Sequence, residues 1–265
     1  MKNIKLWQRV LLMLALLAAT GYATCHAYDF SSNGIYYNIN NTTGTVEVTC
    51  ASDTYNSYSG HVVIPSHVAN GTTVYDVTAV GDNAFRNSAG LTSVTLGDNI
   101  VSLGKRAFMG CSSLTTITIT PAVTAVGDYA FNGCTSLGDV YFDNDTPLEV
   151  GTGAFMGCSA LEKVEWVSSD ELEGRGGLTS LGTNAFARCS SLTRIMLPGN
   201  MQHLGITIFE GCGNLNSITV MKETPLLLQG DPFSLDASKV TIKVPSSGTA
   251  GATAALYENA NGWKK

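Results

Sequence analysis

The sequence predicts an α/β repeat protein, a solenoid in which short and similar coils stack along one axis. Three observations carry this expectation. Phenylalanine recurs at nearly constant spacing, and an apolar pattern with the alternation of a β-strand follows most of these phenylalanines at a fixed distance. The composition also fits, since 28 glycines and a charged fraction of only 14% are typical of β-structure with many tight turns.

The phenylalanine repeat has a period of 23 or 24 residues, with one longer interval of 31. Alanine precedes five of the seven phenylalanines, and cysteine stands three residues after five of them. The phenylalanines are Phe85, Phe108, Phe131, Phe155, Phe186, Phe209 and Phe233. The cysteines are Cys111, Cys134, Cys158, Cys189 and Cys212. One unit of this length cannot bury its apolar face alone, so stacked neighbours are expected to share a continuous core.

Each strand pattern reads Leu-x-x-Ile-x-Ile or a close variant. Its last two apolar positions alternate with outward positions, as in a strand buried on one face. The six copies begin at Leu91, Leu114, Leu137, Leu161, Leu192 and Leu215. We expect these strands to form one parallel sheet, on the concave side that such coils usually have. The Ala-Phe-x-x-Cys segments are expected to form the opposite, convex wall as short helical or irregular turns.

The combined motif, Ile-Gly-x-x-Ala-Phe-x-x-Cys-x-x-Leu-x-x-Ile-x-Ile-Pro, resembles the BspA-like leucine-rich repeats of bacterial surface proteins. The resemblance extends from about Val77 to Val244. The opening Tyr28–Tyr37 and the ending Val244–Lys264 are similar to those of exported Bacteroidales members. The resemblance implies a leucine-rich-repeat solenoid and the role of a surface or secreted adhesin, which binds host matrix proteins or mediates contact between cells. The motif specifies the fold much more closely than the function.

Residues 1–27 are typical of an export signal. Basic residues precede an apolar run from Val10 to Ala19, which at about ten residues is too short to cross a bilayer. Ala27 fits the position before a cleavage site, and Ala23 offers an alternative. The residues before Cys25 match the acylation motif of bacterial lipoproteins poorly, so a lipid anchor there is not favoured. We expect an exported protein, secreted or held at the cell surface.

The charge balance excludes several classes of partner. Residues 1–27 contain three basic residues and no acidic one, so their removal leaves 12 Lys and Arg against 21 Asp and Glu, a net charge of −9. Such a balance argues against nucleic acid and anionic lipid as partners. The sequence has no second apolar stretch that would predict a membrane-spanning segment.

Residues 28–76 depart from the repeat and predict a β-rich N-terminal cap. Strands at Tyr36–Ile39 and Thr45–Val48 flank a turn-rich linker and suggest a hairpin. Two further strands are expected at His61–Pro65 and Thr72–Tyr75. Solenoids need such caps because the end coils would otherwise expose their core.

The solenoid itself is expected over residues 77–244, followed by a C-terminal cap over 245–265. The alanine-rich segment 250–257 predicts a short helix in that cap. The interval of 31 residues places an insert at 167–177. This insert is either a tolerated, solvated loop or a lip beside a binding surface.

The sequence shows no recognisable catalytic constellation, cofactor motif or metal site. The five repeated cysteines would form a ladder rather than a cluster, so buried free thiols are favoured over disulfides or a metal site. His61, His67 and His203 fall in no motif with a nucleophile. The glycines at 151, 153 and 157 align with the repeat and do not indicate a nucleotide loop. We therefore expect no enzyme and no cofactor.

The strand alternation allows a hypothesis about the binding surface. Residues just before and between the two Ile-type positions should face outward. In the outer coils these are mostly hydroxyls, whereas the central coils carry an aromatic ring, a methionine and charges of both signs. The hypothetical ligand-binding residues are Asp139, Tyr141, Lys163, Glu165, Arg194 and Met196. Such residue types favour a protein or glycan partner.

Two alternatives stay open. In the first, the six side chains are ordinary solvated strand residues, and their complementary charges pair with one another across coils. The whole protein is a structural component of the cell envelope or extracellular matrix if it self-associates through its sheet edges or caps. The oligomeric state does not follow from the sequence.

Overall fold

The computed structural model describes residues 28–52, 57–143, 146–167, 177–222, 224–226, 231–233 and 240–244. The expected export signal, with Cys25, lies outside this part of the chain, as do most of the insert and all of residues 245–265. The expected C-terminal helix is not borne out: the described residues form strands and turns without a helix, and residues 250–257 are not among them.

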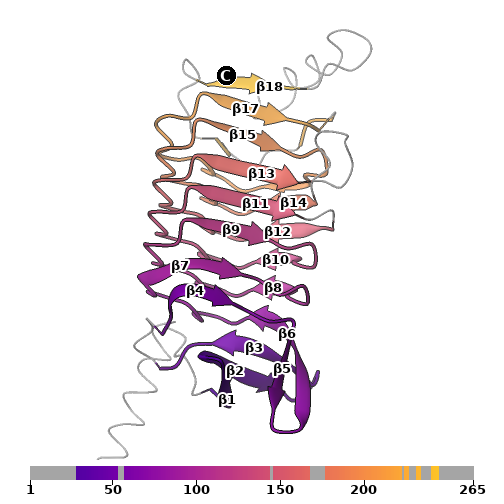
Figure 1. Cartoon of the computed structure of the whole chain (residues 1–265). Helices are drawn as coiled ribbons and strands as arrows, with labels where there is room; N and C mark the ends of the chain where they lie inside the picture. The colour runs from indigo at the N-terminus through magenta and orange to yellow at the C-terminus, as the bar shows by residue number, and fades with distance from the viewer. Residues whose placement is uncertain are drawn as a thin grey trace, which may run out of the picture.

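A column of parallel strands forms one wall of the solenoid (Figure 1). The six strand patterns lie where the sequence places them, and one further strand continues the wall at each end. We call this wall the motif face. Its strands are β4 (Ser59–Val63), β7 (Gly90–Thr95), β9 (Thr116–Ile119), β11 (Asp139–Asp143), β13 (Lys163–Val167), β15 (Arg194–Leu197), β17 (Ser217–Val220) and β18 (Thr241–Lys243).

The motif face is not the single sheet that the sequence predicts. Backbone ladders join β4 to β7, then β9 to β11 and β13, then β15 to β17 and β18. The wall is therefore three parallel ladders, with one break between β7 and β9 and another between β13 and β15. The second break falls where the coil is lengthened by the insert, whereas the first falls between coils of ordinary length.

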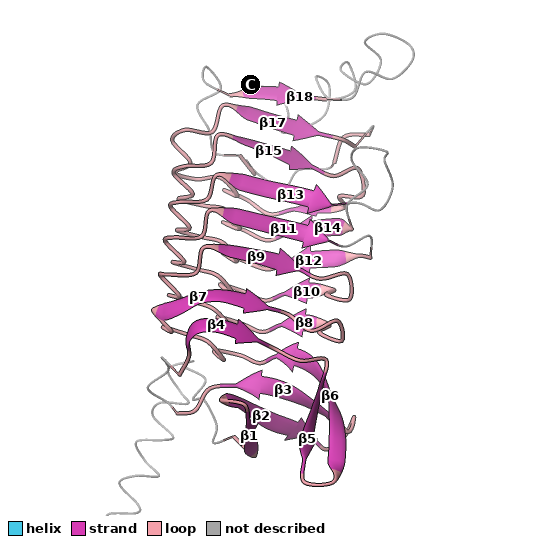
Figure 2. Cartoon of the chain, in the orientation of Figure 1, coloured by secondary structure: helices cyan, strands magenta, loops and turns pink. Residues whose placement is uncertain are grey.

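A second sheet, which the repeat pattern did not predict, lies behind the motif face (Figure 2). Its strands in the repeat region arise from the Val-Gly or Leu-Gly step before each repeat phenylalanine from Phe85 to Phe209. They are β6 (Thr73–Val80), β8 (Ser102–Leu103), β10 (Ala125–Val126), β12 (Leu148–Val150), β14 (Leu178–Leu181) and β16 (His203–Leu204). All of these neighbours pair parallel. Most are too short to give a periodic signal of their own.

The glycine after each of these short strands is required by close packing between coils. A Cβ atom at Gly127 would lie 2.7 Å from the backbone carbon of Gly104, closer than atoms can approach. The residue before the alanine, as at Arg106 and Tyr129, adopts the left-handed backbone conformation with positive φ. The Ala-Phe-x-x-Cys segments then form the expected irregular turns, in which Phe85 N donates to Ala107 O at 2.7 Å.

The core is a column of stacked rings. Consecutive rings from Phe85 to Phe186 lie 4.8–5.2 Å apart and within 9° of parallel, and Phe209 and Phe233 extend the column. Tyr58 begins the column 4.3 Å from Phe85, and its hydroxyl donates to the carbonyl of Thr49. Tyr58 thus joins the N-terminal strands to the solenoid core, a role that no repeat pattern indicated.

The cysteine ladder is confirmed as buried free thiols. Each Sγ donates to the carbonyl of the phenylalanine in the preceding coil, as from Cys134 to Phe108 at 3.1 Å and from Cys158 to Phe131 at 3.2 Å. A cysteine is small enough for this wall and supplies a weak donor for a buried carbonyl. Cys50, in the N-terminal region, is also buried.

The N-terminal hairpin is also confirmed. β2 (Ile35–Asn40) and β3 (Thr45–Thr49) pair antiparallel, and β1 (Phe30–Ser32) pairs antiparallel with β2. β5 (His67–Asn70) folds back antiparallel on β6. Because β3 pairs parallel with β6, these strands and the repeat strands share one sheet.

We expect Phe131→Ala to lower the free energy of unfolding by about 3–5 kcal/mol, because it removes a fully buried ring and leaves a cavity between two others. Denaturant unfolding followed by circular dichroism measures the change. Thr118→Ala, exposed on the motif face, is the control and should change little. Equal effects of the two substitutions would contradict the ring column as the core.

We expect the fully buried ladder thiols Cys134, Cys158 and Cys189 to resist alkylation in the folded protein and to react only on unfolding. Burial raises the pKa of Cys134, and a hydrogen bond with Cys212 followed by burial raises the pKa of Cys189. Burial raises the pKa of Cys158 to about 12 from an ordinary value of 9.0, which suppresses the reactive thiolate. The unfolded chain therefore loses this proton first, and stability should fall as pH rises above about 9. Mass spectrometry with and without denaturant at pH 8 counts the labelled thiols. Fast labelling of Cys158 without denaturant would contradict its burial.

Candidate binding groove

The predicted binding residues occupy three neighbouring strands of the motif face. Asp139 pairs in register with Lys163, and Tyr141 with Glu165, where β11 lies beside β13. Arg194 and Met196 lie on β15, across the break in the ladder. Strand alternation explains their outward position, because the residues between them, such as Val140, point into the core.

The break between β13 and β15 partly exposes the core at this point. Val164 and Trp166 on β13 are only half-buried, whereas Val140 and Phe142, their counterparts on β11, are 0% and 1% exposed. The indole of Trp166 spans the break and donates from Nε1 to the carbonyl of Met196 at 2.6 Å. Its ring stacks on Phe142 at 4.3 Å. One apolar position of the core is thus accessible from the motif face.

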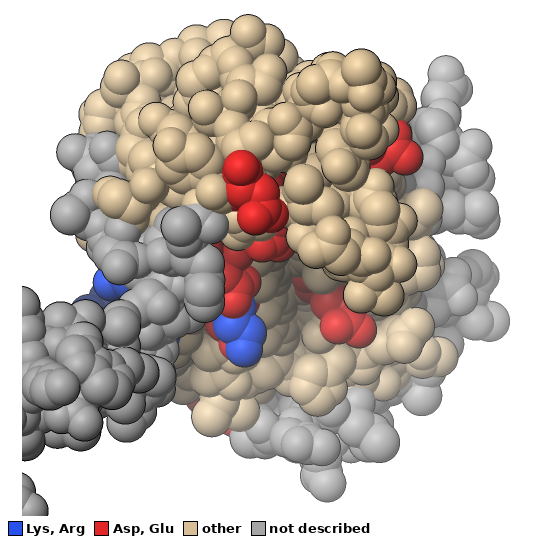
Figure 3. Space-filling view, turned by 90° about the horizontal axis from the view of Figure 1, so that it is seen from below, with Lys and Arg blue, Asp and Glu red and all other residues tan. Residues whose placement is uncertain are grey.

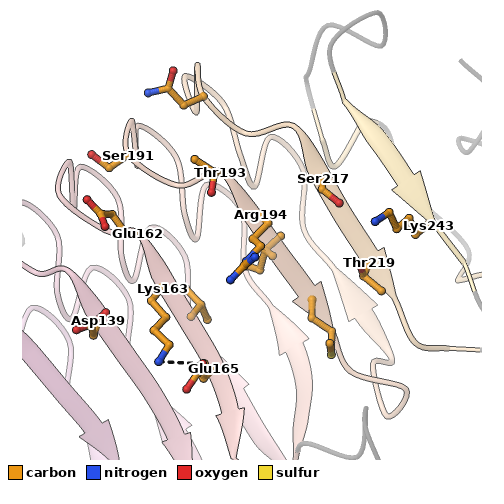
Figure 4. A pocket seen from close by; sticks show the side chains of 14 residues that line it. Asp139, Glu162, Lys163, Glu165, Ser191, Thr193, Arg194, Ser217, Thr219 and Lys243 are labelled. Carbon is orange, nitrogen blue, oxygen red and sulfur yellow. Dashed lines mark ion pairs between the residues drawn. The ribbon is translucent and has the colours of Figure 1, made fainter.

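A groove of about 870 Å³ follows the break (Figure 4). Val164 and Ile195 contribute apolar surface to it, and polar side chains surround them. The lining residues are Asp139, Glu162, Lys163, Val164, Glu165, Ser191, Thr193, Arg194, Ile195, Met196, Asn214, Ser217, Thr219 and Lys243. Val164, Ile195 and Met196 are its only apolar members, so the groove is mostly polar, unlike the mainly apolar pockets that usually hold small molecules.

Lys163 is held in place on the β13 side of the groove. Its Nζ lies 2.9 Å from Glu165 Oε1, 3.5 Å from the Tyr141 hydroxyl and 5.1 Å from the centre of the Tyr141 ring. The hydrogen bond to Glu165 is the main cause that raises the pKa of Lys163 above its usual value. Figure 4 shows the pair extending along one strand rather than across the groove.

The remaining charges of the groove make no ion pair within the described part of the chain. Asp139 and Glu162 lie on the β11–β13 side, and Arg194 and Lys243 lie on the β15–β18 side. The groove therefore has an acidic side and a basic side, each with side chains available to a ligand.

Five of the six predicted residues line the groove, and Tyr141 lies beside it in contact with Lys163. Sequence reasoning missed Glu162 and Thr193, which immediately precede the strands, and Lys243, which lies on a strand outside the Leu-x-x-Ile-x-Ile pattern. Extending the outward row by one coil would have found Lys243. No sequence signal could have shown that Val164 is accessible, because the repeat places it in the core.

A second hollow of about 790 Å³ lies among the N-terminal strands, and His61 and His67 are among the residues that line it. His61 Nδ1 lies 2.6 Å from Ser93 Oγ, but no carboxylate in the described residues orients this imidazole. His67 pairs with Asp76 at 3.0 Å, and both are exposed. Among the described residues no group of three or more His, Cys, Asp or Glu side chains could hold a metal ion.

Acidic side chains outnumber basic ones on the described surface at the N-terminal end of the solenoid (Figure 3). This distribution agrees with the net negative charge of the sequence. No helix in the described residues is long and apolar enough to cross a membrane.

Residues 66–175 and 168–235 match the family described as the BspA type leucine rich repeat region, in six copies. These matches span more than half of the chain. The chain belongs to this family. The family consists of repeat proteins of the solenoid class, in agreement with the stacked coils and the resemblance drawn from the sequence.

Solved structures of bacterial repeat proteins share the fold. The leucine-rich-repeat protein TpLRR of T. pallidum is 18% identical, with 81% of each chain covered and a TM-score of 0.50. The pneumococcal vaccine antigen PcpA is also 18% identical, with 84% of this chain and 72% of that chain covered and a TM-score of 0.54. At this identity the likeness establishes the fold alone. No curated protein matches the sequence significantly.

We expect Lys163→Ala to leave the midpoint of thermal unfolding nearly unchanged, because the Lys163–Glu165 pair is exposed and such pairs contribute little to stability. Leu161→Ala, at a fully buried position of the same coil, is the comparison and should cost about 2–5 kcal/mol. Calorimetry measures both. A loss for Lys163→Ala as large as that for Leu161→Ala would mean that the charged cluster is needed for folding.

Proposed function

We propose that the protein is an extracellular or cell-surface binding module that holds a protein or glycan partner in the groove of the motif face, without catalysis. The groove carries this proposal, because it combines accessible core surface with side chains of both charges that have no ion-pair partner in the described residues. In this proposal residues 28–76 and 245–265 close the two ends of the solenoid formed by 77–244.

The residue types at the groove support an interaction role. Arginine and tyrosine are favoured anchors at protein interfaces, and methionine adapts its shape to different partners. The export signal expected at residues 1–27 would place the groove outside the cell, where a host matrix protein is one accessible partner. The net negative charge disfavours nucleic acid as the partner.

Binding of the exported protein to an array of matrix proteins and surface glycans tests the proposal. We expect a saturable partner whose affinity falls at least about tenfold when Tyr141 and Arg194 are both changed to Ala, a loss of about 1.4 kcal/mol or more. Thr116→Ala with Thr118→Ala, on β9 of the same face, is the matched control and should leave binding unchanged. Melting curves must coincide for all variants.

Two results would count against the proposal. Equal affinity of the Tyr141/Arg194 variant and the parent protein would remove the groove as the binding site. Absence of any partner, together with oligomers that grow with protein concentration, would instead favour a self-associating structural component.

A further inference from the structure

We propose that the groove binds an extended polypeptide segment of about six residues, which lies across the strands with a basic side chain at one end, an apolar one in the middle and an acidic one at the other. This inference rests on the proposed function and names its ligand. It follows from the accessible core at the break, the separation of charge across the groove and the distance between the charged ends.

The break between β13 and β15 sets the middle of the ligand. Val164 is half-buried here, next to Ile195, and both line the groove. An apolar ligand side chain placed over them would remove this surface from water and restore the packing that an unbroken ladder provides elsewhere. Met196, also half-buried, can adapt to the side chain that enters.

The charged side chains set the two ends. Asp139 and Glu162 on the β11–β13 side fit a basic ligand residue, and Arg194 and Lys243 on the β15–β18 side fit an acidic one. Lys163 also lies on the acidic side, but its charge is paired with Glu165 and contacts the Tyr141 hydroxyl, so the acidic character of that side remains. A ligand with charges of one sign only would place like charges together at one end, which is unfavourable.

The strand spacing sets the length. Four intervals separate β11 from β18 along the motif face, through β13, β15 and β17. Three of these intervals are hydrogen-bonded at about 4.8 Å each, and the unpaired interval from β13 to β15 is at least as wide. The outermost charged residues, Asp139 on β11 and Lys243 on β18, therefore lie roughly 19 Å or more apart, which an extended chain spans in about six residues at about 3.3 Å each.

The same lining favours a peptide over a glycan. Sugar rings usually bind by stacking their C–H faces on aromatic rings, and no aromatic side chain lines the groove in the described residues. Tyr141, beside it, has Lys163 Nζ over its ring at 5.1 Å. The hydroxyl groups of Ser191, Thr193 and Ser217 line the groove and can bond the amides and carbonyls of a peptide backbone. The Asn214 side-chain oxygen can accept as well, while its Nδ2 donates to Ser190 O at 2.8 Å.

The test uses a synthetic seven-residue peptide with arginine at one end, leucine in the centre, glutamate at the other end and serine spacers. A second peptide carries arginine at both ends. We expect the full-length exported protein to prefer the first peptide, as measured by calorimetric titration. The double variant R194E/K243E should lose at least about tenfold in affinity for the first peptide and gain affinity for the second.

The double variant K105E/R188E is the matched control. It makes the same change of net charge outside the groove lining, so it should leave the preference intact. Coincident melting curves establish that all variants fold. If R194E/K243E and K105E/R188E change the peptide preference equally, the proposal is overturned, because the preference then depends on net charge alone.

The outcomes also separate this inference from the proposed function. If neither peptide binds at millimolar concentration, the peptide proposal is overturned. The proposed function then stands or falls on the array. A glycan that depends on Tyr141 and Arg194 would keep the groove as the site with another class of ligand, and a partner insensitive to both residues would remove the site as well.

Discussion

The structure depends on contact between neighbouring coils. Each coil is too short to bury its own apolar side chains, and it gains a core only when the ring of one coil lies on the ring of the next. The column from Tyr58 to Phe233 is the visible result. Backbone hydrogen bonds on both sheets, and the thiol-to-carbonyl bonds of the cysteine ladder, fix the same separation between coils. The requirement for close approach also explains why glycine follows each short strand of the rear sheet.

A local failure of this regularity produces the candidate site. Where the insert lengthens one coil, the backbone ladder between β13 and β15 is lost, although the ring column continues from Phe155 to Phe186 at 5.2 Å. The solenoid therefore tolerates the break, because the core and the rear sheet still connect the two coils. What changes is access: Val164 and Trp166 become partly exposed on a face where their counterparts are buried. Stability and the accessible surface of the candidate groove are thus supplied by different parts of the same coil.

The charges of the groove contribute little to folding. Lys163 and Glu165 pair on the surface, where solvent screens their attraction, and the other four charged side chains have no ion pair in the described residues. Charges that add little to folding can still direct a partner and reject others, because like charges brought together at an interface are unfavourable.

The sequence by itself determined the repeat, the positions of the six motif strands, the N-terminal hairpin, the buried thiols and five of the residues that line the groove. These follow from periodicity and strand alternation, which are local properties of the chain. Only the tertiary structure decided that the rear wall is a second sheet, that the motif face is three ladders, that Tyr58 begins the ring column, and that Val164 is accessible beside Lys243. Each of these depends on hydrogen bonds or packing between coils about 23 or more residues apart, and a two-residue strand or a lost ladder has no periodic signal of its own.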